Sequence, residues 1–92
     1  MTDLQKKQAH KIADHYGIEN QALQTVEECS ELIVAIMNKR RDKGTVDDIV
    51  DEIADVEIMC EQMRYAYNCT DKVDERIKQK LERQKYRMEV GA

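Results

Sequence analysis

The chain has 92 residues, of which 37% are charged, and its formal net charge is −4 at pH 7. This length predicts one domain over residues 1–92 that is too small to enclose a deep substrate cavity, so we expect it to form oligomers. The interspersed charges give no sustained basic surface and argue against nucleic-acid binding. No apolar run approaches the ~18 residues needed to cross a membrane, and the three cysteines lack the spacing of a zinc site. These features indicate a soluble, cytoplasmic protein.

The first two predicted helices begin at residues suited to capping. Thr2 and Gln5 have the spacing of a capping box and predict a helix over residues 3–16. Asn20 is placed to cap a second helix over residues 21–41. Both segments carry apolar residues at helical spacing, so each predicted helix has one apolar face.

Two further helices follow. Thr45 and Asp48 again have capping-box spacing, and the apolar repeat behind them continues to about residue 67. Thr70 can cap a last helix with a narrower apolar stripe among many charges. Proline is absent from the chain. The predicted fold class is therefore all-α, an antiparallel four-helix bundle-like subunit within an oligomer.

The second and third predicted helices are joined by a short polar connection, Arg40-Arg41-Asp42-Lys43-Gly44. Short connections favour antiparallel neighbours, so we expect these helices to form a hairpin. Their acidic motifs should then lie within reach of each other.

Each helix of this hairpin carries an acidic pair at i, i+3 spacing, Glu28-x-x-Glu31 and Glu52-x-x-Asp55. The members of a pair lie about 60° apart on a helix. Glu28 and Glu31 are roughly opposite the apolar stripe of their helix, and Glu52 and Asp55 share a side with Met59 while the stripe of their helix points elsewhere. Four carboxylates that converge would repel one another and require a cation. Carboxylate oxygens without His or Cys favour Mg²⁺, with Mn²⁺ as the natural substitute. An acidic pair is also common on any solvated helix in so charged a chain, and that interpretation stays open.

The motifs resemble those of a known enzyme family. Glu27-Glu28-Cys29-Ser30-Glu31-Leu32, followed by Asp51-Glu52-Ile53-Ala54-Asp55-Val56, resembles the EExxE and ExxD motifs of the MazG-like nucleotide pyrophosphohydrolases. Lys80-Leu81-x-x-Gln84-x-x-Arg87 is similar to the family's Lys-Leu-x-x-Asn-x-x-Arg stretch. Two departures are Gln84 in place of Asn, and Met88-Glu89 in place of a frequent Tyr-Pro. The resemblance covers about residues 20–88.

This resemblance implies a helical bundle assembled as a dimer or a dimer of dimers, with housekeeping or phage-associated enzymes as its compact members. It implies Mg²⁺-dependent hydrolysis of a (d)NTP to the (d)NMP and pyrophosphate. The implied metal ligands are Glu28, Glu31, Glu52 and Asp55. Glu27 would bind a second metal or orient the attacking water, and the implied phosphate contacts are Lys80, Arg83 and Arg87.

Two alternatives remain at this point. A related all-α pyrophosphatase acting on phosphoribosyl-ATP, dUTP or dCTP would share these motifs. A non-catalytic helical oligomer or partner-binding module would carry the acids on a solvated face and use the apolar stripes for association.

Overall fold

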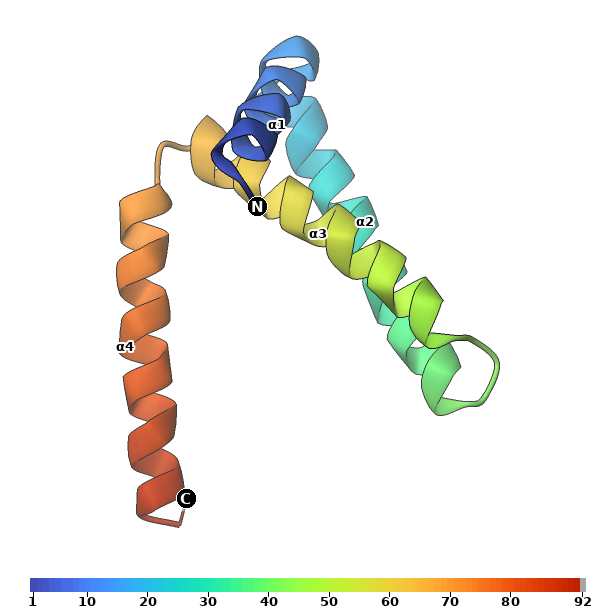
Figure 1. Cartoon of the computed structure of the whole chain (residues 1–92), viewed down its shortest axis with the longest axis vertical. Helices are drawn as coiled ribbons and strands as arrows, with labels where there is room; N and C mark the ends of the chain where they lie inside the picture. Colours follow the sequence, from blue (N-terminus) through green and yellow to red (C-terminus); the bar gives the residue numbers. More distant parts are fainter. Residues whose placement is uncertain (92) are drawn as a thin grey trace.

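The computed structural model describes residues 1–91, which form four helices (Figure 1): α1 Asp3–Tyr16, α2 Ile18–Arg40, α3 Val46–Ala66 and α4 Thr70–Glu89. The described residues include no strand, which confirms the all-α prediction. None of the helices within this range is long and apolar enough to span a bilayer.

Two predicted capping boxes are confirmed. The Thr2 hydroxyl accepts a hydrogen bond from the Gln5 backbone N–H at 3.1 Å, and the Thr2 N–H donates to the Gln5 side chain at 2.8 Å. Thr45 and Asp48 repeat the arrangement at 3.2 Å and 2.9 Å. Each box satisfies N–H groups that a helix start leaves without partners, and so fixes the starts of α1 and α3.

Two other predicted helix starts are wrong. Gly17, not Asn20, is the N-cap of α2, and it also ends α1. Its φ of 90° and ψ of 154° lie in a region that only glycine populates readily, which lets one helix follow another with a single residue between them. Asn20 lies inside α2, where its amide donates to the Tyr16 carbonyl at 2.8 Å. In α4 the N-cap is Cys69, without a side-chain bond, and Thr70 is the first helical residue.

The α2/α3 hairpin forms as predicted and is the most extensive helix pair in the chain, with α1 packed mainly on α3 (Figure 1). The interior is small. Its buried apolar side chains are Ala9, Ala13, Ala35 and Met59. Gln21 and Gln62 are buried with them between α2 and α3, joined by an amide hydrogen bond of 2.7 Å.

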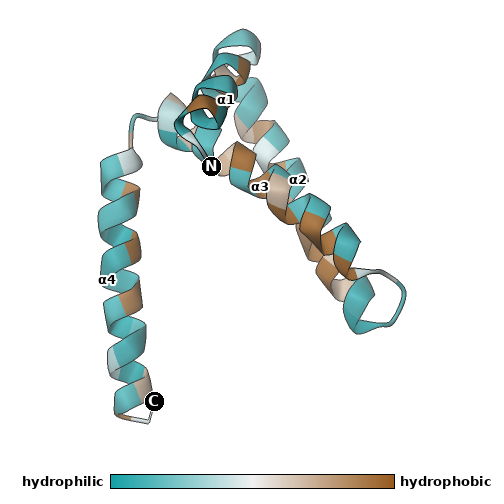
Figure 2. Cartoon of the chain, viewed as in Figure 1, coloured by the Kyte–Doolittle hydropathy of each residue, from teal (hydrophilic) through white to brown (hydrophobic). Residues whose placement is uncertain are grey.

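Several apolar residues of the hairpin stripes are exposed, and Figure 2 shows apolar positions recurring along α2 and α3. Val26 and Ile33 on α2 are 65% and 62% exposed, and Val46 on α3 is 60% exposed. Burial raises the pKa of Cys60, and so does the nearby Cys29 thiol, so these two stripe positions are neighbours across the two helices. The stripes therefore form one continuous apolar face on the hairpin, while the polar side chains occupy the seam between its helices.

Helix α4 stands apart from the other three (Figure 1). It has no buried residue, and among the other helices it contacts only α3. Arg64 of α3 contacts the N-terminal part of α4. It forms an ion pair with Asp74 at 2.7 Å and donates a hydrogen bond to the Thr70 carbonyl at 3.4 Å. One chain thus packs three helices together and does not complete a four-helix bundle by itself.

The exposed surface area of the chain is also larger than that of a compact domain of the same mass. The chain exposes 7381 Å², whereas a compact monomer of its mass, 10.8 kDa, exposes about 5,500 Å². Its radius of gyration is 15.9 Å, against about 12 Å for a compact domain of this length. An excess of roughly 1,800 Å² is comparable to what each chain of a stable homodimer buries.

A group of polar and aromatic contacts joins α1 to α3. His10 pairs with Glu61 at 2.8 Å, and its ring stacks on Tyr65 with centroids 4.2 Å apart. The Tyr65 hydroxyl donates to Asp14 at 2.7 Å, a bond that raises the Tyr65 pKa. From the sequence we expect His10 to be a surface residue, because every acid is four or more positions away from it. The structure shows it half-buried, with its partner 51 residues away.

We predict that His10→Ala lowers the free energy of unfolding by about 1–3 kcal/mol, because it removes the stacked ring and leaves Glu61 partly buried without its partner. Denaturant unfolding at pH 7 measures this. The matched control is His15→Ala, since His15 is exposed on the same helix and its ring contact is with the adjacent Tyr16. Equal losses of unfolding free energy in the two variants would contradict a stabilising role for the contacts of His10 with Glu61 and Tyr65.

Candidate metal centre

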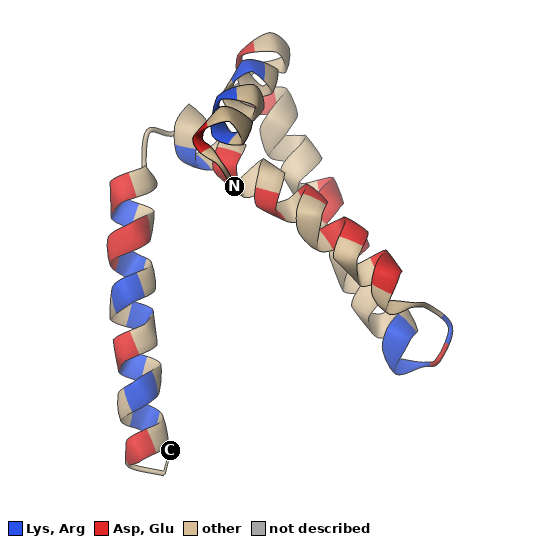
Figure 3. Cartoon of the chain, viewed as in Figure 1, with Lys and Arg blue, Asp and Glu red and all other residues tan. Residues whose placement is uncertain are grey.

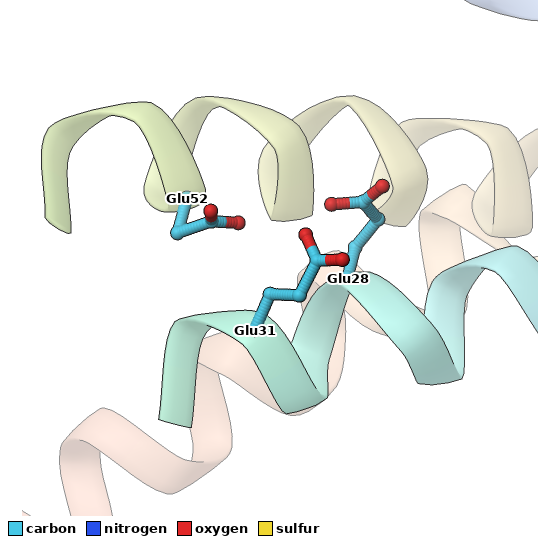
Figure 4. Close-up of side chains that lie close together, drawn as sticks. All are labelled: Glu28, Glu31 and Glu52. Carbon is cyan, nitrogen blue, oxygen red and sulfur yellow. The ribbon is translucent and has the colours of Figure 1, made fainter. Parts of the chain in front are cut away.

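Three acidic side chains meet in the seam between α2 and α3. Glu28 and Glu31 project from α2 and Glu52 from α3, and Figure 4 shows their carboxylates turned toward one another. One oxygen from each lies within 4.8 Å of the others. The convergence predicted for the hairpin is therefore present for these three residues.

Asp55 lies at the edge of this group. Desolvation, followed by the charge of Glu28, raises its pKa, which places its carboxylate beside that of Glu28. The antiparallel register explains the pairing. Seven residues forward along α2 from Gln21 to Glu28 match seven residues back along α3 from Gln62 to Asp55. Three further steps on each helix bring Glu31 opposite Glu52.

Repulsion between the carboxylates and their desolvation both raise the pKa values of the cluster. The charge of Glu28, then desolvation, then the charge of Glu52 raise the pKa of Glu31. Desolvation, then the charges of Asp55 and Glu28, raise the pKa of Glu52. The ion pairs found within residues 1–91 include none of these four acids.

Two oxygens of the cluster lack partners. Glu28 Oε2 and Glu52 Oε2 are buried and accept no hydrogen bond from the described part of the chain. The other Glu28 oxygen accepts a bond from the Gln24 amide at 2.9 Å. Buried polar atoms are ordinarily paired, and an all-carboxylate donor set is the kind that hard divalent cations prefer. The residues present therefore fit Mg²⁺ or Mn²⁺.

Glutamines extend the polar seam, and sequence reasoning missed them. Gln24 lies four residues before Glu28 and Gln21 seven before it, so both fall on the Glu28 stripe of α2. Gln24 holds the Glu28 carboxylate, and Gln21 with Gln62 fixes the register further along. The helical spacing could have identified all three as seam residues.

Glu27 lies outside the cluster. It is exposed on α2 and borders an open groove together with Tyr16, Asn20 and Gln24. The Gln24 amide connects this groove to the Glu28 carboxylate. Glu27 is thus near the acids without being one of the converging side chains.

The implied phosphate contacts are not at the cluster. Lys80, Arg83 and Arg87 are exposed on α4, and α4 contacts neither α1 nor α2. Figure 3 shows many basic positions along α4, a helix that diverges from the hairpin with its acidic positions. Within one chain, the structure brings the predicted metal ligands together but does not bring the predicted phosphate ligands to them.

The raised pKa values predict a pH dependence for the metal-free protein. Glu31, Glu52 and Asp55 bind protons more tightly when folded than when unfolded, so they cost no stability while protonated at acid pH. The free energy of unfolding should therefore fall as the pH rises through the raised pKa values of these three carboxyl groups toward 7.

Thermal melts in a chelator test this. Glu52→Gln should raise the melting temperature of the metal-free protein at pH 7 and flatten its pH profile, because it removes one repelling charge. Glu82→Gln, the same change on exposed α4, should alter neither. A lower melting temperature for Glu52→Gln would show that the carboxylates do not repel in the seam.

Comparison of the chain with models of protein families, with curated proteins and with solved structures gave no match.

Proposed function

We propose that the chain is a divalent-metal-dependent nucleoside triphosphate pyrophosphohydrolase of the MazG-like type, which hydrolyses a (d)NTP to the (d)NMP and pyrophosphate. The observation that carries the proposal is the carboxylate cluster with two buried, unpaired oxygens between α2 and α3. A solvated acidic face would not aim its carboxylates at one another inside a helix pair. The family motifs on the same residues supply the substrate class.

Glu28, Glu31, Glu52 and Asp55 would hold the Mg²⁺, and Mn²⁺ would serve in its place. When bound, the metal supplies charge stabilisation to phosphate oxygens during displacement. Gln24 orients Glu28 by its hydrogen bond, which keeps one carboxylate oxygen aimed into the seam.

Groups outside the cluster would bind substrate and water. Glu27, exposed beside the cluster, would bind a second metal or accept a proton from the attacking water. The groove bordered by Tyr16, Asn20 and Gln24 offers an aromatic ring and amides to a nucleoside. Lys80, with Arg83 and Arg87, would bind the phosphates.

The proposal includes a homodimer or homotetramer, because the outward apolar face of α2 and α3 requires cover. The same exposed face favours the second candidate, a helical module that binds a partner and has no activity. The two candidates differ in their response to metal, since only the enzyme needs a cation at the carboxylates.

Magnesium should stabilise the fold. A cation bound only by the folded state, at 100 times its dissociation constant, adds about 2.7 kcal/mol to the free energy of unfolding. We therefore expect millimolar Mg²⁺ to raise the melting temperature of the chain and of Glu82→Gln, but not of Glu28→Gln. The non-catalytic candidate predicts identical curves with and without Mg²⁺.

Activity should depend on the same residues. Pyrophosphate release from a panel of (d)NTPs, with phosphoribosyl-ATP included, should identify at least one substrate and separate the related pyrophosphatases. Glu28→Gln and Asp55→Asn should each lower kcat/KM roughly 100-fold or more, because charge stabilisation by a catalytic metal is worth several kcal/mol. Glu82→Gln should retain full activity. A complete panel without turnover in Mg²⁺ or Mn²⁺ would reject the proposed enzyme.

A further inference from the structure

The groove beside the acidic cluster combines uncovered apolar groups with a row of polar side chains. It lies where α1 meets α2 and is lined by Tyr16, Asn20, Gln21, Leu23, Gln24 and Glu27. Its volume of about 540 Å³ is within the range of ligand sites. Tyr16 and Leu23 are 57% and 71% exposed, so an aromatic ring and an aliphatic side chain are free to contact the faces of a flat ligand.

The corner between α1 and α2 gives this groove its shape. Gly17 is the one residue between the two helices, so Tyr16 at the end of α1 lies close to the first turn of α2. The Asn20 amide donates to the Tyr16 carbonyl at 2.8 Å and ties the two helix ends together. This bond satisfies a carbonyl that a helix end otherwise leaves without a partner. The positions of Tyr16 and Asn20 in the groove are therefore coupled.

Hydrogen bonds determine which arm of each amide is left for a ligand. The Gln24 amide donates to the Glu28 carboxylate at 2.9 Å, and the Asn20 amide donates to the Tyr16 carbonyl. An ionised carboxylate and a backbone carbonyl only accept hydrogen bonds, so the nitrogen of each amide must be the arm that faces them. Each nitrogen keeps one further hydrogen, but on the arm held by its protein partner. The oxygen arms of Asn20 and Gln24 are the ones left to a ligand.

Glu27 adds a third acceptor to the same row. Asn20, Gln24 and Glu27 follow one another at positions i, i+4 and i+7, so they share one stripe of α2. An ionised carboxylate offers a ligand acceptors only. Gln21, the remaining polar side chain of the groove, is buried with its amide bonded to Gln62. The exposed polar side chains along the groove therefore present oxygen acceptors.

A row of acceptors distinguishes nucleobases by their exocyclic groups. Cytosine and adenine carry an amino group, which donates hydrogen bonds, whereas thymine carries an oxygen in the equivalent place. Uracil differs from cytosine, and hypoxanthine from adenine, by an oxygen in place of that amino group. An exocyclic oxygen opposite a carbonyl or carboxylate oxygen forms no hydrogen bond and meets another set of lone pairs. The groove is thus suited to the amino member of each pair.

We infer that this groove is the base subsite, and that Asn20, Gln24 and Glu27 select bases with an exocyclic amino group over bases with an oxygen at the same position. The inference rests on the proposed function for the identification of the ligand as a nucleotide. Gln24 serves both parts of the site, because its nitrogen holds Glu28 and its oxygen faces the base. A nucleotide with its base in the groove extends its phosphates along α2 toward the acids.

Hydrolysis of matched nucleotide pairs tests the selection. For dCTP against dUTP, and for dATP against dITP, kcat/KM should favour the amino member about 10-fold, the value of one net hydrogen bond. Equal kcat/KM values within both pairs would overturn the selection and leave the proposed function intact. If none of the four nucleotides is hydrolysed, the proposed function fails, and nucleoside binding decides the base subsite.

Two substitutions of Gln24 separate selection from support of Glu28. Gln24→Met removes both arms, so it should lower kcat/KM and also reduce the dCTP to dUTP ratio about threefold or more. Gln24→Glu keeps an acceptor but cannot donate to Glu28, so it should lower kcat/KM and retain the ratio. The matched control is Gln79→Met, because Gln79 also donates to an acid four residues away, Glu75, but on exposed α4. It should change neither quantity, and an unchanged ratio in Gln24→Met would contradict the selection.

Nucleoside binding tests the base subsite without metal, phosphate or catalysis. In ¹H–¹⁵N spectra of the labelled chain, deoxycytidine should shift the side-chain amide signals of Asn20 and Gln24 several times more than deoxyuridine at the same concentration. The Gln79 amide should not move with either nucleoside. Equal shifts from the two nucleosides, or no shift at Asn20 and Gln24, would refute the inference even for an active enzyme.

Discussion

The arrangement of the whole chain depends on the seam between α2 and α3, where carboxylates and amides occupy positions that apolar side chains would fill in an ordinary helix pair. Glu28 and Glu52 each keep one buried oxygen without a partner there, and neighbouring charges and desolvation raise the pKa values of Glu31, Glu52 and Asp55. Such a seam is unfavourable unless something else stabilises the pair. Within the chain, that support comes from Ala35, Met59 and the bond between Gln21 and Gln62.

Placing acids in the seam forces the apolar stripes outward. Because Glu28 and Glu31 face α3, the apolar stripe on the opposite side of α2 must face away from α3. The result is a three-helix unit with four buried apolar side chains and a surface far larger than its mass requires. Helix α4 has no buried residue, so it adds further exposed surface. The polar seam and the exposed apolar face are thus two consequences of one pattern.

Local chemistry made the helices and the acidic convergence predictable from the sequence. The Thr2 and Thr45 caps, the polar turn and the i, i+3 acids all act within a few residues, and the hairpin follows from a short connection. The predictions failed where contacts between distant residues, or an unusual backbone conformation, determine the structure. Gly17 can adopt a backbone conformation that restarts a helix at once, which no spacing rule signals. His10 meets Glu61 only because α1 packs on α3, and the divergence of α4 from the other helices follows no local spacing rule.

The proposed metal binding and the proposed association would act on the same hairpin, which would couple them. A cation in the seam would draw α2 and α3 together from one side, while a second chain would cover their apolar face from the other. Each event stabilises the helix geometry that the other needs, so by linkage each must strengthen the other by the same free energy. A protomer without metal would then associate more weakly, and an isolated protomer would bind metal more weakly. Such reciprocity would confine a highly charged site to the assembled form.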